Sequence, residues 1–208
     1  MGLISFFSKP SNGVSQTYVL VGLGNPGRVY RNTRHNVGFM TLDVLCQEIN
    51  IKLSRMQSNA LIGSGFVDER KVILAKPQTF MNLSGKAVSS LVKFYKIPLS
   101  QLLVIHDDID LQFGTLRMRP GGGSAGQKGL ASIIQQLGTQ DFPRLRIGVG
   151  RPPGQMSGAD YVLQDFSTSE QAVLNEVLGR AAQAAQIFIK SGPEQAMNQF
   201  NGALDKEN

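Results

Sequence analysis

The stretch Thr17-Tyr-Val-Leu-Val-Gly22-Leu-Gly24-Asn-Pro-Gly27-Arg-Val-Tyr-Arg-Asn-Thr-Arg-His-Asn-Val-Gly-Phe39 decides how the rest of the chain is arranged. Its first part, residues 17–23, is an apolar, largely β-branched run closed by glycine, which predicts a buried strand. Residues 37–49 have apolar side chains at helical spacing and predict a helix. A strand therefore leads into a polar loop that contains Asn25, Tyr30 and His35, and a helix carries the chain away.

Three glycines of this stretch, Gly22, Gly24 and Gly27, have the spacing of the dinucleotide-binding fingerprint. That fingerprint also requires a helix that begins within the glycines, so that its N-terminus faces the pyrophosphate. Here Pro26-Gly27 predicts a turn instead, and no acidic residue ends a second strand about 20 residues further on, where the ribose contact belongs. The sequence therefore argues against nucleotide binding, and the glycines are interpreted as a tight turn that lets the backbone approach a neighbouring group.

The composition is that of an ordinary soluble globular domain. The chain has 208 residues, of which 41% are hydrophobic, and no apolar run approaches the roughly 18 residues that a membrane span needs. With 21 Lys and Arg against 15 Asp and Glu, the net charge is +6, which weakly favours a polyanionic partner. Cys46 is the only cysteine, so no intrachain disulfide is possible and a reducing compartment is expected. Residues 1–16 lack the features of a targeting segment and are expected to form a loose tail.

The rest of the chain mixes predicted strands and helices. Strands are expected at residues 61–67, 71–76, 102–105, 115–119 and 144–150. The segment 76–85 opens a predicted helix with its apolar face at residues 87–95, and a second helix is expected at 130–137. A Ser167/Glu170 capping box predicts a long helix at 168–191, with a short C-terminal helix after Gly192-Pro193. No internal repeat or domain linker interrupts this order. We therefore predict a single α/β domain over residues 17–201, a three-layer sandwich with a twisted mixed sheet flanked by helices, followed by a polar tail at 202–208.

Four polar segments lie at the ends of predicted strands or at the starts of predicted helices: residues 25–36, 81–82, 106–110 and 121–129. Strand ends at one edge of an open α/β sheet meet at a cleft, so these segments are expected to form the site. A nearby aspartate would orient a loop histidine and favour its charged form. No Gly-x-Ser-x-Gly elbow is present, so an enzyme of this sequence would use water activated by His35 or His106.

The acidic cluster Asp107, Asp108 and Asp110 invites a metal interpretation, because hard cations prefer carboxylate ligands. Alternate residues of an extended segment point to opposite faces, however, so Asp107 and Asp108 cannot easily share one ion. No Cys/His spacing suggests zinc. We therefore expect no metal and no cofactor, and a turn-forming role for Asp108 and Asp110 stays as open as a functional one.

The segment Gly121-Gly-Gly-Ser-Ala-Gly-Gln-Lys-Gly129 precedes a predicted helix and contains Lys128. Exposed backbone amides, a helix N-terminus and a lysine together make a good phosphate site. A flexible surface loop is the alternative. Four arginines on the neighbouring predicted strands extend the basic surface and favour the phosphate interpretation; they are Arg117, Arg119, Arg144 and Arg146.

Taken together, these segments closely resemble the bacterial-type peptidyl-tRNA hydrolase family. The matches run in family order from about Thr17 to Asn201: Val21-Gly-Leu-Gly-Asn-Pro-Gly27, Tyr30, Thr33-Arg-His-Asn-Val-Gly-Phe39, Lys76-Pro-x-Thr-Phe-Met-Asn82 with Ser84-Gly85, His106-Asp-Asp-x-Asp-Leu111 and Arg144-Leu-Arg-Ile-Gly-Val-Gly150. The resemblance implies a monomeric, metal-free cytoplasmic enzyme. It would hydrolyse the ester between a peptide and the 3′ ribose of tRNA, and so recycle tRNA from stalled or abandoned translation.

The resemblance also implies roles for the residues at the matching positions. His35 would activate water, with Asp107 as its hydrogen-bonding partner. Asn25 and Asn82 would position the peptidyl part, and one of them would stabilise the developing oxyanion. Tyr30 and Met81 would help to shape the cleft.

One departure from the family pattern falls in the glycine-rich segment, where Gln127-Lys128 replaces the common His-Asn pair. Lysine cannot accept a hydrogen bond, but a cation there would strengthen attraction to tRNA phosphates, so Lys128 is expected to contact the acceptor-stem or 3′-end backbone. The departure also raises an alternative of another class, a catalytically lapsed RNA-binding relative of the plastid splicing-factor type. The complete set of Asn25, His35, Asn82 and Asp107 favours the enzyme.

Overall fold

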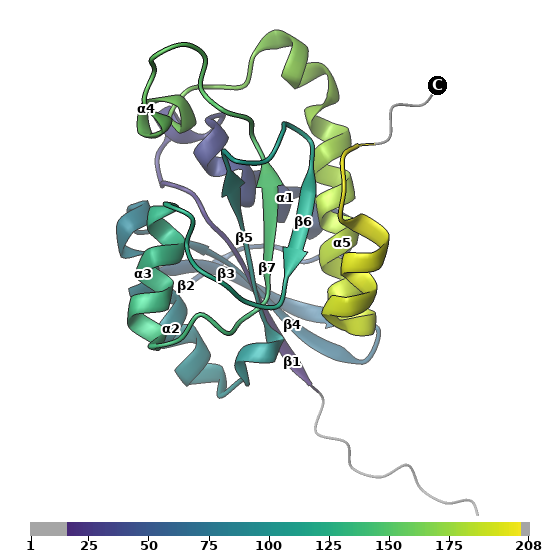
Figure 1. Cartoon of the computed structure of the whole chain (residues 1–208). Coiled ribbons are helices and arrows are strands. Elements are labelled where there is room, and N and C mark those ends of the chain that lie inside the picture. Colours follow the sequence, from purple (N-terminus) through teal and green to yellow (C-terminus); the bar gives the residue numbers. More distant parts are fainter. Residues whose placement is uncertain (1–15, 205–208) are drawn as a thin grey trace, which may run out of the picture.

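The structure, a computed structural model, describes residues 16–204. Its centre is a seven-stranded sheet with the strand order β2-β3-β4-β1-β5-β7-β6 (Figure 1). The strands are β1 (Thr17–Gly22), β2 (Arg55–Gln57), β3 (Ala60–Val67), β4 (Arg70–Pro77), β5 (Leu102–Asp108), β6 (Leu116–Arg119) and β7 (Arg144–Gly148). Strands β4, β1, β5 and β7 pair in parallel, whereas the β2–β3, β3–β4 and β6–β7 pairs are antiparallel. The predicted mixed sheet is confirmed.

Strand β1 occupies the middle of the sheet, between β4 and β5. Val19, Leu20 and Val21 are fully buried, because helices cover both faces of the sheet at this point. The chain reaches β4 on one side of β1 and then crosses to β5 on the other. The carboxyl ends of these three parallel strands therefore meet at a topological switch point, which is where ligands bind in open α/β sheets.

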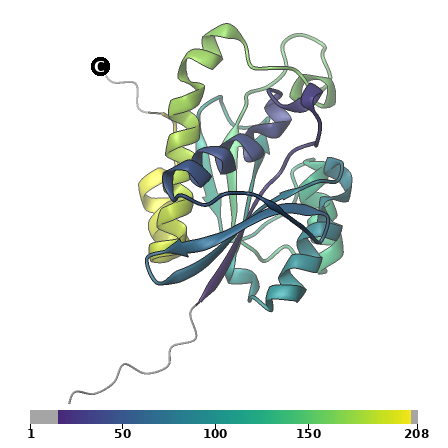
Figure 2. The same ribbon diagram turned by 180° about the vertical axis from the view of Figure 1, so that it is seen from behind.

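Helices form a layer on each face of the sheet. Helices α1 (Val37–Glu48) and α5 (Thr168–Phe200) lie together on one face, as Figure 2 shows, and α2 (Ser84–Tyr95) and α3 (Lys128–Leu137) cover the other. The alternation of β1 side chains divides the core accordingly, since Leu20 packs with α1 and α5 and Val21 packs with α2 and α3. The three-layer sandwich is thus confirmed. Short elements complete the fold: η1 (Arg28–Tyr30), η2 (Arg34–Asn36), η3 (Met81–Leu83), η4 (Leu99–Gln101) and α4 (Gly158–Val162).

Several element boundaries differ from the predicted ones. Strand β5 continues through Asp108 instead of ending at Ile105, because it pairs with β7 as far as Gly148. Strand β2, with three residues, and α4, with five, were not predicted, since elements this short have no periodicity to read. The Ser167/Glu170 capping box is present at the start of α5, and the helix is interrupted where predicted, at Gly192.

The two chain ends bear on the predicted domain limits. The loose tail predicted at residues 1–16 lies outside the described residues except for Gln16, as do residues 205–208 of the predicted C-terminal tail. The fold itself extends past residue 201. Gly202 exchanges two backbone hydrogen bonds of 2.9 Å with Leu116, and Leu204 packs against the core beside α5.

Candidate active site

A cleft of about 450 Å³ opens at the carboxyl edge of the parallel strands. The loops that follow β1 and β4 and the end of β5 form its floor, and the start of α3 and the short helix α4 form its walls. Its lining residues are Asn25, His35, Phe80, Met81, Asn82, Asp107, Asp108, Ile109, Ala125, Gly126, Gln127, Lys128, Gly158, Ala159, Val162 and Leu163. The segments singled out in the sequence therefore do converge.

His35 and Asp107 form a buried pair on the floor of the cleft. The Nδ1 atom of His35 lies 2.8 Å from Oδ2 of Asp107, and the two residues are 8% and 3% exposed. Because an ionised carboxylate only accepts hydrogen bonds, Nδ1 carries the proton and donates it, which leaves Nε2 as an acceptor. Gly38 permits this approach, since a Cβ there would overlap the backbone carbonyl of Ile105 in β5.

Asp107 is kept ionised by its neighbours. Burial by itself would raise the pKa of this carboxyl group, but the charge and hydrogen bond of His35 and a hydrogen bond from Gln127 lower it below its ordinary value. Asp108 points to the other side of β5, where Oδ2 accepts a 2.5 Å hydrogen bond from Nε of Arg146. The prediction that Asp107 and Asp108 face apart is therefore confirmed. Asp108 also accepts the backbone N–H of Asp110, which is a turn-forming contact.

Asn25 is held by three hydrogen bonds in a fixed orientation. Its Oδ1 accepts the backbone N–H of Met81 at 2.8 Å, and its own backbone N–H and C=O bond to the side-chain amide of Asn36 at 2.8 and 2.9 Å. Within residues 16–204 its Nδ2 amide makes no hydrogen bond, so this donor is free to bind a ligand in the cleft. Asn36 was not predicted as a site residue, although it lies inside the quoted motif; its position next to His35 was the available signal.

The remaining predicted cleft residues occupy different places. Met81 is buried beneath the cleft and Asn82 is exposed on its rim, both in η3. Lys128, the first residue of α3, is exposed at the rim. Tyr30 is half-buried in η1 and is not among the residues that line the cleft.

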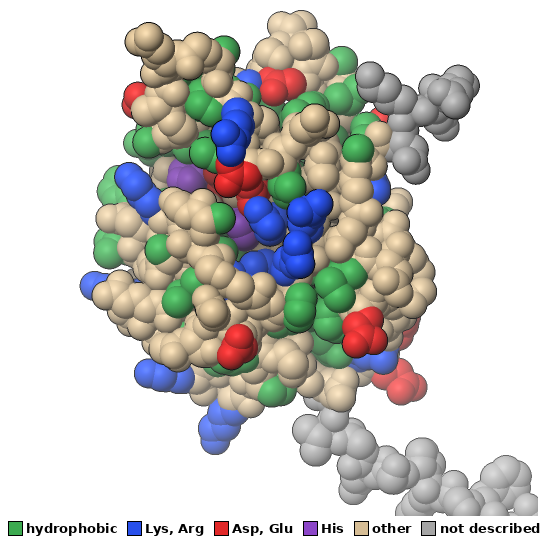
Figure 3. Space-filling model, in the orientation of Figure 1, with side chains coloured by type: hydrophobic (Ala, Val, Ile, Leu, Met, Phe, Trp, Pro, Cys, Tyr) green, Lys and Arg blue, Asp and Glu red, His purple; other side chains and the backbone are tan. Residues whose placement is uncertain are grey.

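The basic residues surround a second cavity of about 360 Å³ between β6, β7 and the glycine-rich loop. Arg119 and Arg146 line it, and Arg117 is exposed two residues from Arg119. Lys and Arg side chains gather at the centre of the face shown in Figure 3, beside a histidine and acidic groups. The structure thus brings the predicted basic surface next to the cleft.

Arg144 differs from the other arginines, because it is only 2% exposed. Its guanidinium donates hydrogen bonds to the carbonyls of Gly122, Gly123 and Gln140, and burial together with the nearby charge of Arg146 lowers its pKa to about 10. A carbonyl cage of this kind braces the glycine-rich loop. Sequence reasoning placed this arginine on the open surface with its neighbours.

His106, the second histidine, faces the second cavity and not the cleft. Its Nδ1 lies 2.7 Å from the carbonyl oxygen of Asp107, so Nδ1 donates and the buried Nε2 has no hydrogen-bond partner within residues 16–204. Burial lowers the pKa of this imidazole, although the carboxylate and carbonyl of Asp107 act against the shift. Of the two histidines, only His35 is therefore placed to act in the cleft.

Three further observations concern possibilities that the sequence raised. Among residues 16–204, no cluster of three or more His, Cys, Asp or Glu side chains is placed to hold a metal ion. In the same part of the chain, no helix combines the length and the apolar character that crossing a membrane requires. Burial raises the pKa of the Cys46 thiol to about 11, which makes it a poor nucleophile.

The cleft has the groups that a hydrolytic enzyme needs, since a histidine paired with an aspartate beside a fixed amide donor suits the attack of water on a carbonyl. Comparison with known proteins specifies the family of hydrolases. The family model described as peptidyl-tRNA hydrolase matches residues 19–208, and the chain belongs to that family.

Individual relatives agree with this assignment. The peptidyl-tRNA hydrolase of Chloroflexus aggregans is 48% identical over 88% of this chain and 98% of its own length. The mitochondrial peptidyl-tRNA hydrolase of Oryza sativa is 47% identical over 94% of this chain and 78% of its own length. The crystal structure of peptidyl-tRNA hydrolase from Acinetobacter baumannii superposes with a TM-score of 0.84 at 34% identity, covering 90% of this chain and 95% of that one. These relatives carry the names of enzymes, so the comparisons do not support the alternative of a lapsed RNA-binding protein.

Proposed function

We propose that the protein hydrolyses the ester bond between a peptide and the 3′ ribose of peptidyl-tRNA, which releases tRNA from stalled or abandoned translation. The buried His35–Asp107 pair in the cleft is the observation that carries this proposal. Its support from outside the chain is the family to which the protein belongs.

The reaction begins with His35. Nε2 takes a proton from a water molecule as the water oxygen attacks the ester carbonyl, and Asp107 stabilises the imidazolium through Nδ1–H. The Nδ2 amide of Asn25 would donate to the oxyanion that develops, and the amide of Asn82, which also lines the cleft, would assist it. The C–O bond to the ribose then breaks, and the proton on Nε2 passes to the departing 3′ oxygen. Atoms and charge balance without a covalent intermediate.

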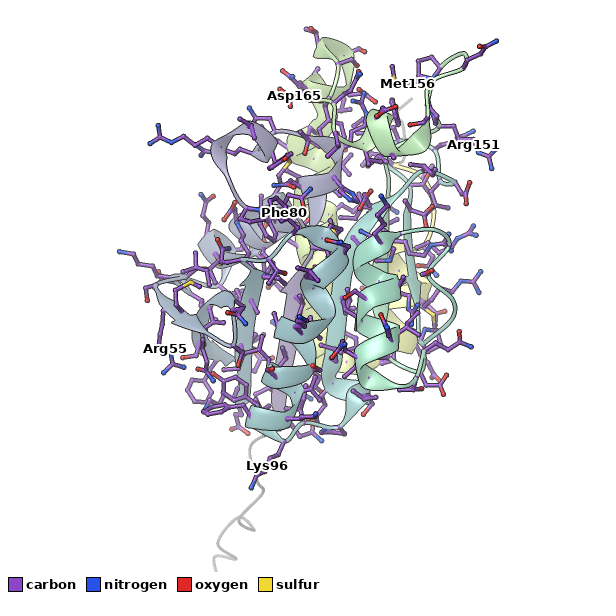
Figure 4. The ribbon with its side chains drawn as sticks, turned by 90° about the vertical axis from the view of Figure 1, so that its left-hand side faces the viewer. Arg55, Phe80, Lys96, Arg151, Met156 and Asp165 are labelled. Atoms are coloured by element: carbon purple, nitrogen blue, oxygen red, sulfur yellow. The ribbon has the colours of Figure 1, made fainter. Side chains whose placement is uncertain are left out.

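The peptide would lie along the apolar side of the cleft. Ile109, Val162 and Leu163 line this side, and Phe80 is 58% exposed at the mouth. Figure 4 shows Phe80 near the N-terminal end of α2, on the side of the molecule away from Lys96. Apolar side chains of the peptide would gain free energy by leaving water here.

The tRNA would lie along the basic side. Lys128 lines the cleft, and Arg117, Arg119 and Arg146 continue the positive surface toward the second cavity. Cations in a row attract a phosphate backbone through counterion release, with little dependence on base sequence. The burial of Arg144 suits a bracing role for this residue, in which it shapes the loop that the tRNA would contact.

The test of the activity is release of an N-blocked aminoacyl group from tRNA by the wild type and by His35→Ala. We expect the variant to lose a factor of about 10²–10⁴ in kcat/KM, which is the usual contribution of a general base. Full activity in His35→Ala would refute the assigned base. No release by the wild type would refute the proposed reaction.

The tRNA surface is tested by Lys128→Asn, with Lys96→Asn as the matched control. Lys96 is exposed at the far end of α2 and has a positive φ of 52°, which asparagine tolerates. We expect weaker tRNA binding by Lys128→Asn and a salt slope smaller by about 0.7–0.9, with no change for the control. Equal affinity and an unchanged slope for Lys128→Asn would refute its contact with the backbone.

We also propose that the enzyme is a monomer that acts in the cytoplasm without a metal, as the resemblance to bacterial-type members implies. Relatives from plants are named as mitochondrial in Oryza sativa and chloroplastic in Arabidopsis thaliana. Sedimentation at assay concentration measures the oligomeric state. Activity after dialysis against a chelator measures any need for a metal.

A further inference from the structure

We propose that Gln127 is a positioning residue for the reaction, because it holds Asp107 in the orientation that His35 requires. Its Nε2 amide donates to Oδ1 of Asp107 at 3.0 Å, while Oδ2 of the same carboxylate accepts from His35. This inference rests on the proposed function, in which His35 is the base.

The direction of the Gln127 amide follows from its other contact. Its Oε1 accepts the backbone N–H of Leu130 at 2.7 Å, as the side-chain cap of α3. A backbone N–H can only donate, so the oxygen must face Leu130 and the nitrogen must face Asp107. The amide therefore offers Asp107 a donor and never an acceptor, which favours the ionised carboxylate over the protonated form.

The contact links the catalytic carboxylate to a rigid element. Gln127 is 9% exposed and is the N-cap residue of α3, and its Nε2 also lies 3.3 Å from Sδ of Met81 beneath the cleft. With both oxygens bound, the carboxylate plane of Asp107 is fixed from two directions. Without Gln127, one oxygen is free, and the carboxylate can rotate about Cβ–Cγ and release His35 from its productive orientation.

Two variants separate this role from helix capping. Gln127→Ser retains an N-cap oxygen for the N–H of Leu130, but its hydroxyl is too short to reach Asp107. We expect its melting temperature to stay close to that of the wild type while kcat falls by about tenfold or more, the effect of losing a hydrogen bond to a charged group. KM should change little, because the substrate does not lose a contact.

Gln127→Glu retains the length and the cap acceptor but sets a second carboxyl group against Oδ1 of Asp107, and two carboxyl groups this close share one proton. While that proton is bound, Asp107 accepts less strongly from Nδ1 of His35, so the productive pair forms fully only after the shared proton leaves at higher pH. We therefore expect the acid limb of the pH profile of kcat/KM to move to higher pH. Gln135→Glu, an exposed position on the same helix, makes the same change in charge away from the cleft and should leave the profile unchanged.

The inference is overturned if folded Gln127→Ser and Gln127→Glu both show the kcat and the pH profile of the wild type. It is also overturned if Gln127→Ser loses activity only in proportion to a fall in melting temperature. His35→Ala, measured in the same assay, distinguishes the two proposals. Wild-type kinetics in the Gln127 variants together with an inactive His35→Ala would refute the role of Gln127 and leave the proposed function intact. An active His35→Ala would refute the assignment of His35 as the base.

Discussion

Replacing Arg34 by methionine tests how the connection between α4 and α5, which follows the cleft wall, is attached to η2. Arg34 follows the loop of Asn25 and directly precedes His35, and it is buried although it is charged. Its Nη2 donates to Oε2 of Glu170 at 2.6 Å. Its Nη1 donates to the backbone carbonyls of Gln164, at 3.3 Å, and of Asp165. The guanidinium also lies 4.3 Å from the ring centre of Tyr161. One side chain thus ties η2 to the whole connection between α4 and α5.

The expected loss of stability follows from these contacts. Removing one partner of a buried ion pair costs about 3–5 kcal/mol, mostly because the remaining charge is left unpaired. Glu170 is the remaining charge here, and it keeps the backbone N–H of Ser167 at 2.6 Å and some access to water. We therefore expect the low end, about 3 kcal/mol. At about 2–4 °C per kcal/mol for a domain of this size, Arg34→Met should lower Tm by about 6–12 °C.

The same change should affect substrate binding more than chemistry. Helix α4 supplies Ala159 and Val162 to the cleft wall, whereas His35 and Asp107 are held by other contacts. A less rigid wall should raise KM for peptidyl-tRNA and leave kcat within about threefold of the wild-type value. The contacts that are lost bind the substrate equally in the ground state and in the transition state.

Thermal unfolding followed by circular dichroism and steady-state hydrolysis are the measurements. Arg31→Met is the matched control, since the same side chain is exposed three residues earlier and its loss should be neutral within about 0.5 kcal/mol. A double-mutant cycle with Glu170→Gln should give a coupling energy of at least about 1 kcal/mol. A Tm of Arg34→Met within about 2 °C of the wild type, with no coupling to Glu170, would refute the reasoning.

Three further predictions concern the packing of α2 against α3, the dependence of stability on pH, and the hydrogen bonds between Asn25 and Asn36. Gly85→Ala should cost about 1–3 kcal/mol in urea unfolding, because its Cβ would overlap the carbonyl oxygen of Ser132 where α2 meets α3. Burial lowers the pKa of His106 in the folded protein. At pH values below about 6.5, the ordinary imidazole pKa, this side chain therefore takes up a proton when the protein unfolds. Stability should therefore be lower at about pH 5.5 than at about pH 7.5, with a smaller difference in His106→Gln, as urea midpoints will report. Asn36→Ala should reduce kcat, because Asn25 loses both backbone supports; unchanged kcat in a folded variant would contradict this.

The sequence predicted the features that depend on local periodicity. The apolar run at residues 17–23 did form the central strand, and the period of two along β5 did place Asp107 and Asp108 on opposite faces. The turn predicted at Pro26-Gly27 also holds, since Gly27 has a φ of 111° and no α-helix begins between Gln16 and Asn36. Local sequence was sufficient because each of these outcomes is set by neighbours within a few residues.

The sequence could not predict which charged or polar side chains are buried. Arg144 was assigned to the basic surface together with Arg117, Arg119 and Arg146, yet carbonyls of a distant loop surround it. Arg34 and Gln127 were given no structural role, because their partners lie 136 and 20 residues away along the chain. Such contacts depend on how loops meet in space, and no spacing in the sequence reports that.

The division of the cleft has a consequence for the proposed reaction. Its apolar wall of Ile109, Val162 and Leu163 suits a peptide, and its basic side, beginning at Lys128, suits a phosphate backbone. His35 lies in the same cleft, so an ester bound there would join two groups that contact different surfaces. The intact substrate gains from both surfaces at once, because its halves are held at high effective concentration. After hydrolysis each product retains one surface only, so peptide and free tRNA should each dissociate more readily than the substrate.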